Sequence, residues 1–205
     1  MPPRYLPTPL LLCFAHSETL GAQIQILSCL QWLGDFQVLA CIPLDGSVPI
    51  EDVSIIANVP EAQLRRVLHM TTIVGFLQEA QPGHIAHTSL SANFVTRPSY
   101  LDAALFLAET AAPAALHMQS ATKRYGQSSN PSECAYSLAF NTAQSFQATC
   151  KQRPKLRRQF PSYFRYLSEG SDDNAIAVKL LGRLDWLQLG NARVVDVSTP
   201  PFPCF

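Results

Sequence analysis

The sequence predicts a mainly α-helical protein: a winged helix-turn-helix module, a helical linker, and the first strand of an α/β domain that does not continue. Three observations predict this order. Apolar residues recur at helical spacing from Gln23 to Cys41, two short helices and a hairpin follow in residues 49–87, and Val194–Val197 is typical of a buried strand. A chain of 205 residues, 47% apolar and 15% charged, excludes a disordered protein and suffices for a core.

The winged helix-turn-helix is predicted over residues 23–97. Its first helix ends before Pro43, and Pro49 opens a second helix whose first turn is acidic, as the helix dipole favours. Pro60 begins a third helix with two distinct faces. The inner stripe is Leu64, Val67, Leu68 and Thr71 or Thr72, and the outward residues are Arg65, Arg66 and His69.

A β-hairpin completes this module. Gly75 ends the third helix, residues 76–79 form one strand, and Ile85–His87 form the return strand after a proline–glycine turn. His84 and His87 stand three positions apart, so on one strand they point to opposite faces. That placement argues against a metal site shared by the two.

A helical linker is predicted over residues 98–190. Ser99 is placed to cap a long helix from Tyr100 to Tyr125, and Pro113 predicts a kink in that helix near Thr110. Three more helices are expected over residues 135–146, 155–167 and 175–187.

The two ends differ from the rest of the chain. Seven of the 16 prolines fall in the first nine and last six residues, and residues 1–22 form an atypical proline-rich N-terminus whose apolar run is short for a secretory signal. Residues 191–205 carry the orphan strand, in which Asp196 alone matches a cofactor-binding motif. Ser198, a threonine and two prolines follow where a glycine-rich loop is needed. We therefore expect no cofactor and no catalytic residue.

Four stretches carry a resemblance to a known family: LQWLGDFQVLACIPLDGSVPIEDV, PGHIAH, SYLDAALFLAETAAPAALHM and RLDWLQLGNARVVDVS. They resemble the transcriptional co-activators of fungal aflatoxin and sterigmatocystin gene clusters, which are built like O-methyltransferases. The resemblance covers about Ile24 to Ser198. It implies a dimerising winged helix, a zinc-cluster transcription factor as partner, and no methyl transfer. It also implies truncation before the S-adenosylmethionine-binding domain, in a genuine short protein or a mis-spliced gene product.

Two sets of residues are candidate partner-binding sites. One is a run of five basic residues in eight, typical of a nuclear-import patch or of a surface for an acidic partner; the alternative is a solvated helix start balanced by Glu169, Asp172 and Asp173. This run comprises Lys151, Arg153, Lys155, Arg157 and Arg158. The other is a set of dimer-interface anchors on the long helix, for which a core position is the alternative. These anchors are Leu101, Leu105, Phe106 and Leu116.

Other chemistries are disfavoured. Glu61 and Glu79 flank the outward face of the third helix, and the formal net charge is zero, so no direct DNA contact is expected. The six cysteines show no metal-type spacing, and no apolar run approaches the roughly 20 residues of a membrane helix.

The resemblance implies a non-catalytic co-activator of an aflatoxin-type polyketide cluster, located in the nucleus, the cytoplasm or both. It would act through a zinc-cluster transcription factor and form a homodimer. Two alternatives remain open: an inactive fragment of an S-adenosylmethionine-dependent O-methyltransferase acting on an aromatic polyketide, and a degraded gene product without function.

Overall fold

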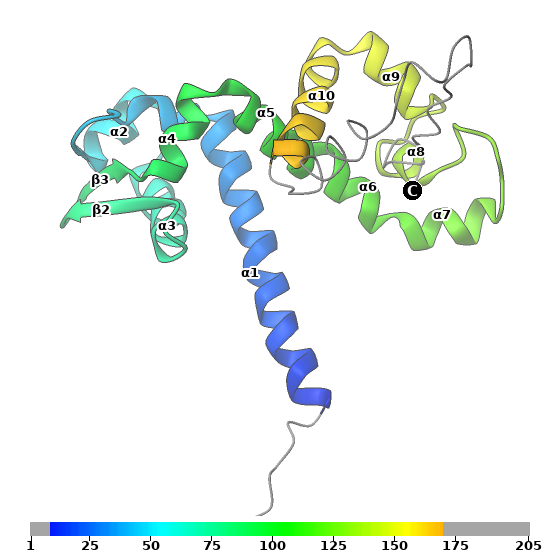
Figure 1. The fold of residues 1–205 in the computed structure, drawn as a ribbon, viewed down its shortest axis with the longest axis horizontal. Coiled ribbons are helices and arrows are strands. Elements are labelled where there is room, and N and C mark those ends of the chain that lie inside the picture. Colours follow the sequence, from blue (N-terminus) through cyan, green and yellow to red (C-terminus); the bar gives the residue numbers. More distant parts are fainter. Residues whose placement is uncertain (1–8, 170–205) are drawn as a thin grey trace, which may run out of the picture. The chain divides into compact units, whose positions relative to one another are not determined.

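The computed structural model describes residues 9–169 and is mainly helical, as predicted. The chain divides into two compact units, Met1–Pro98 and Ser99–Phe205, called unit 1 and unit 2 below (Figure 1). The helix predicted over residues 175–187 and the strand predicted at Val194–Val197 lie outside the described residues, as does the 191–205 segment.

Unit 1 begins with a single long helix, α1 (Pro9–Asp35), which starts well before the predicted Gln23. The predicted continuation to Cys41 is wrong, because Gln37 adopts a left-handed conformation at φ 54° and ends the helical path. A separate 3-10 turn, η1 (Val38–Cys41), follows and buries Val38 and Leu39.

The rest of unit 1 follows the predicted order of two helices and a hairpin (Figure 1). Its elements are β1 (Val48–Pro49), α2 (Ile50–Ile56), α3 (Glu61–Ile73), β2 (Leu77–Gln81), β3 (His84–His87) and α4 (Ser89–Thr96). The three strands form one antiparallel sheet in the order β1-β3-β2, with Val48 opposite Ile85 and Leu77 opposite His87.

The core of unit 1 lies where α3 packs against α1, α2 and the hairpin. The predicted inner stripe of α3 is confirmed, since Leu64, Val67, Leu68 and Thr71 are all buried. The outward residues of the same helix are exposed. Phe76 and Phe94 meet edge to face and attach α4 to the start of the hairpin.

Unit 2 contains the predicted long helix in three pieces. The first piece is α5 (Pro98–Phe106), which starts one residue before the predicted Ser99 cap. The second is the π-helical segment η2 (Leu107–Ala111), which continues into α6 (Ala112–Leu116), and the third is α7 (Met118–Tyr125). The wide turn η2 lies where the kink was predicted, because Pro113 has no N–H to give the Glu109 carbonyl. A second break at His117 was not predicted.

The helix predicted over residues 135–146 is shorter than expected. The structure has α8 (Ala135–Ala139) instead, and Asn141 follows it with a left-handed φ of 47°. Ser145 then caps a separate helix, α9 (Phe146–Gln152), and its hydroxyl accepts a hydrogen bond from Ala148 N at 3.3 Å. The last described helix of this unit is α10 (Pro154–Glu169), and it contributes to a buried cluster. The cluster contains Phe106, Ala111 and Leu156, packed against Phe146, Cys150, Phe160 and Tyr163.

Candidate partner-binding surfaces

The predicted basic run spans the junction of two helices in unit 2. Lys151 lies in the last turn of α9, Arg153 is its C-cap, and the other three residues lie in the first turns of α10. Pro154 opens α10 because the first helical position needs no backbone N–H. The structure therefore divides the run between two helices and the residue that joins them.

Two of its five cations are bound within unit 2. Lys155 Nζ lies 2.7 Å from Glu109 Oε1, and Arg158 Nε donates to both Asp102 oxygens at 3.0 and 2.8 Å. The carboxylate side chains are only 18% and 10% exposed. These pairs join α10 to η2 and to α5, between residues that lie 46 and 56 positions apart in the sequence. The local pattern of charges therefore does not predict them.

The other three cations of the run are exposed at the surface of unit 2. Lys151, Arg153 and Arg157 are exposed, and within the described residues none has a carboxylate partner. Their charges are thus available to an acidic partner. We call these three residues the basic face.

The predicted dimer-interface anchors lie in different environments. Leu105 and Phe106 are buried, at 7% and 2% exposure, and Phe106 is part of the unit 2 core, which fits the alternative of a core position. Leu101 is half-buried. Leu116 is 81% exposed beside the break at His117, and Met118 on the other side of that break is 49% exposed.

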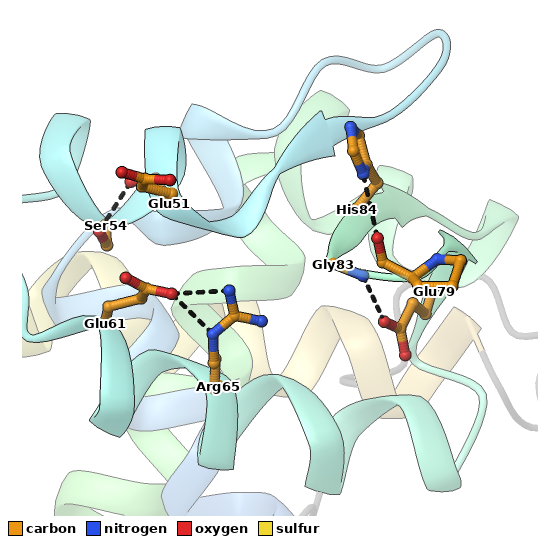
Figure 2. Close-up of polar contacts among 8 residues, drawn as sticks. Glu51, Ser54, Glu61, Arg65, Glu79, Gly83 and His84 are labelled. Atoms are coloured by element: carbon orange, nitrogen blue, oxygen red, sulfur yellow. Dashed lines mark hydrogen bonds and ion pairs between the residues drawn. The ribbon is translucent and has the colours of Figure 1, made fainter.

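The outward face of α3 and the hairpin border a cleft in unit 1. Arg65 Nε and Nη2 lie 2.7 and 2.6 Å from Glu61 Oε1, and across the cleft Gly83 N donates to Glu79 Oε1 at 2.7 Å (Figure 2). The cleft has a volume of about 270 Å³. Its lining consists of Ile50, Arg65, Leu68, His69, Thr72, Glu79 and Ile85.

The two hairpin histidines have different environments and share no partner among the hydrogen bonds of the described residues. His84 is half-buried and its Nδ1 lies 3.4 Å from Pro82 O, whereas His87 is buried. Burial lowers the pKa of His87, although hydrogen bonds to the Leu39 and Ile42 carbonyls oppose that shift.

The metal-ligating and thiol side chains of the described residues lie apart from one another or are partly buried. Among residues 9–169 no group of three or more metal-ligating side chains converges. Cys29, Cys41, Cys134 and Cys150 are free thiols, and burial raises the pKa of Cys29, Cys41 and Cys150, which disfavours the reactive thiolate. No described helix combines the length and apolarity needed to cross a bilayer.

The formal net charge of the whole chain is zero, but the two units carry opposite net charges. Residues 1–98 carry four basic and seven acidic side chains, and residues 99–205 carry eleven basic and eight acidic ones. Unit 1 is therefore acidic and unit 2 basic by three formal charges each.

Curated relatives match most of this chain. It is 54% identical over 179 residues to the monodictyphenone cluster transcriptional coactivator mdpA of Emericella nidulans, covering 87% of this chain and 37% of that protein. It is 53% identical to the dothistromin biosynthesis regulatory protein aflJ of Dothistroma septosporum, over 88% of this chain and 39% of that protein. It is 49% identical to the aflatoxin cluster transcriptional coactivator aflS of Aspergillus parasiticus, covering 85% and 39%.

The resemblance inferred from the sequence is thereby confirmed: close relatives are named as transcriptional coactivators of secondary-metabolite clusters. The chain spans about two fifths of the length of these three relatives. No protein-family model matches it.

The fold resembles solved structures of the O-methyltransferase type. OxaC in complex with SAH and oxaline gives a TM-score of 0.63 at 14% identity, over 78% of this chain and 40% of that one. LaPhzM gives a TM-score of 0.60 at 19% identity, over 88% of this chain and 49% of that one. The mitomycin 7-O-methyltransferase MmcR gives a TM-score of 0.59 at 19% identity, over 78% of this chain and 46% of that one. At such identities the likeness shows the fold alone, that of the N-terminal region of O-methyltransferases.

Proposed function

We propose that this chain is a non-catalytic transcriptional coactivator of an aflatoxin-type polyketide cluster, acting through the cluster's zinc-cluster transcription factor. The observation that carries the proposal is identity of 49–54% to proteins named as cluster coactivators or biosynthesis regulators, over 85–88% of this chain. The proposal places the chain in the nucleus, the cytoplasm or both.

Unit 1 serves as a winged-helix module in this proposal. The order of α2, α3 and the hairpin, with β1 as third strand, supports it. Direct DNA reading is not part of the role, because Glu61 neutralises Arg65 and the hairpin carries Glu79. Exposed Leu116 supports a homodimer contact on unit 2.

The basic face is the proposed contact for the factor. It offers Lys151, Arg153 and Arg157 without internal carboxylate partners among the described residues. Lys155 and Arg158 have a structural role instead, since reversing either would place a negative charge beside Glu109 or Asp102.

Co-purification with the factor tests this assignment. Lys151→Glu with Arg157→Glu is expected to weaken the association about tenfold, because two favourable charge contacts become repulsive. The control reverses the same number of charges on α7, with Lys123→Glu and Arg124→Glu, and is expected to retain binding. Equal loss in both double variants, or no association of the unaltered chain, would contradict the proposal.

The likeness to methyltransferases favours a second candidate, a fragment of an S-adenosylmethionine-dependent O-methyltransferase. Calorimetric titration of the chain with S-adenosylmethionine separates the two. Micromolar binding would support an enzyme that holds the cofactor by itself and would count against the non-catalytic proposal.

A further inference from the structure

The cleft between α3 and the hairpin has a strip of polar groups over an apolar floor. Arg65, His69 and Thr72 recur along one face of α3, and Glu79 faces them from β2. Ile50, Leu68 and Ile85 provide the floor. Ile50 N donates to Gly83 O at 2.9 Å, which ties the start of α2, part of the floor, to the hairpin turn.

The charges of this cleft do not cancel. Arg65 is already paired with Glu61 at 2.6 Å, so its positive charge is compensated on its own helix. Glu79 accepts a hydrogen bond from the neutral Gly83 N–H, and no cation pairs with it within the described residues. The cleft together with Glu61 therefore carries one uncompensated negative charge, at Glu79 (Figure 2).

A long cationic side chain matches this combination. The methylene stem of an arginine or lysine covers apolar surface while its charged head remains at a polar edge. The Glu79 carboxylate is held in place by the Gly83 N–H, so its orientation is set before a guanidinium arrives. A phosphate or an acidic side chain would instead meet Glu79 unfavourably.

We propose that this cleft binds an arginine- or lysine-bearing segment of a DNA-binding partner. The inference rests on the proposed function, because it adds a second contact with the same transcription factor. Charge complementarity supports it: unit 1 has seven acidic against four basic side chains, and DNA-binding domains are basic.

Binding of a fluorescein-labelled peptide of four Arg-Ala repeats to the full chain tests the cleft directly. Glu79→Gln keeps an acceptor for Gly83 N but removes the charge, and about fivefold weaker binding is expected. Asp45→Asn makes the same charge change on a loop of unit 1 outside the cleft and is expected to bind like the unaltered chain. Circular dichroism verifies that each variant folds.

A second variant changes Glu61 on α3, the helix opposite Glu79. Glu61→Gln removes the carboxylate that neutralises Arg65, so the cleft loses its net negative charge and the arginine peptide is expected to bind more weakly here too. Affinity should fall as salt rises.

The proposal is overturned if the unaltered chain does not bind the peptide at millimolar concentration. It is also overturned if Glu79→Gln binds as tightly as the unaltered chain, or if a Glu-Ala peptide or duplex DNA binds better. Co-purification separates this failure from that of the proposed function. A factor retained equally by the unaltered chain and by Glu79→Gln rejects the cleft and leaves the coactivator role intact.

Discussion

His87 joins three segments of unit 1 through both nitrogens of its ring. Nδ1 lies 2.9 Å from Ser91 Oγ on α4, and Nε2 lies 3.1 Å from Leu39 O in η1. A carbonyl oxygen only accepts, so Nε2 carries a proton and donates to Leu39 O. Burial lowers the pKa of the ring, which favours its neutral form.

This arrangement predicts a pH-dependent stability. Because the folded pKa lies below the unfolded value of about 6.5, the unfolded chain binds the proton first. The His87 contribution is fully present above pH 6.5 and is lost as the pH falls through the folded pKa. Urea unfolding between pH 7.5 and 5 should show this loss as a free energy of unfolding that falls with pH. His87→Gln should make that dependence on pH less steep and lower the free energy of unfolding by about 1–3 kcal/mol at pH 7.5.

His69→Gln is the control, because His69 is exposed and should leave the slope unchanged. An unaltered slope in His87→Gln would contradict the assignment.

Buried polar residues mark the limit of sequence reasoning at this scale. The sequence predicts Leu64 and Leu68 as core because an apolar stripe has a helical period. No pattern predicts that Asp102 is 7% exposed or that Gln159 is fully buried with no hydrogen-bond partner for its amide among the described residues. The burial of Asp102 depends on a partner 56 positions away in sequence, Arg158.

Element boundaries were predictable where proline or glycine sets them. Pro49, Pro60 and Pro113 each mark a helix start or irregularity that the structure has. The missed breaks fall at residues without such a signal, since Gln37 and Asn141 adopt φ values of 54° and 47°. Asparagine tolerates that conformation, but glutamine has no special preference for it, so only tertiary packing accounts for the end of α1.

Two glycines in helical contexts should respond oppositely to alanine. Gly75 follows α3 at φ 72°, so Gly75→Ala is expected to destabilise by about 1–2 kcal/mol. Gly21 lies within α1, so Gly21→Ala is expected to stabilise by up to about 1 kcal/mol. A Cβ at either position would meet nothing within 4 Å, so the difference is purely conformational. Chemical denaturation measures both, and shifts of the same sign would contradict the argument.

At the scale of the whole molecule, the distribution of charge matters more than its sum. A net charge of zero would suggest a protein without long-range electrostatics. Unit 1 at minus three and unit 2 at plus three instead make each copy attractive to the opposite unit of another copy. The exposed side chains of Leu116 and Met118 offer a different route to self-association, driven by apolar burial.

Salt separates these two routes. The Debye length falls from about 30 Å at 0.01 M to about 8 Å at 0.15 M salt, so charge-driven association should be strong at the lower concentration and weak at the higher one. Light scattering at pH 7 is therefore expected to show an apparent mass that decreases as salt is added. Lys151→Glu with Arg157→Glu brings unit 2 from plus three to minus one and should abolish the effect. An apparent mass that stays constant or rises with salt, and that falls on Leu116→Glu, would assign self-association to the apolar face instead, because added salt does not weaken apolar burial.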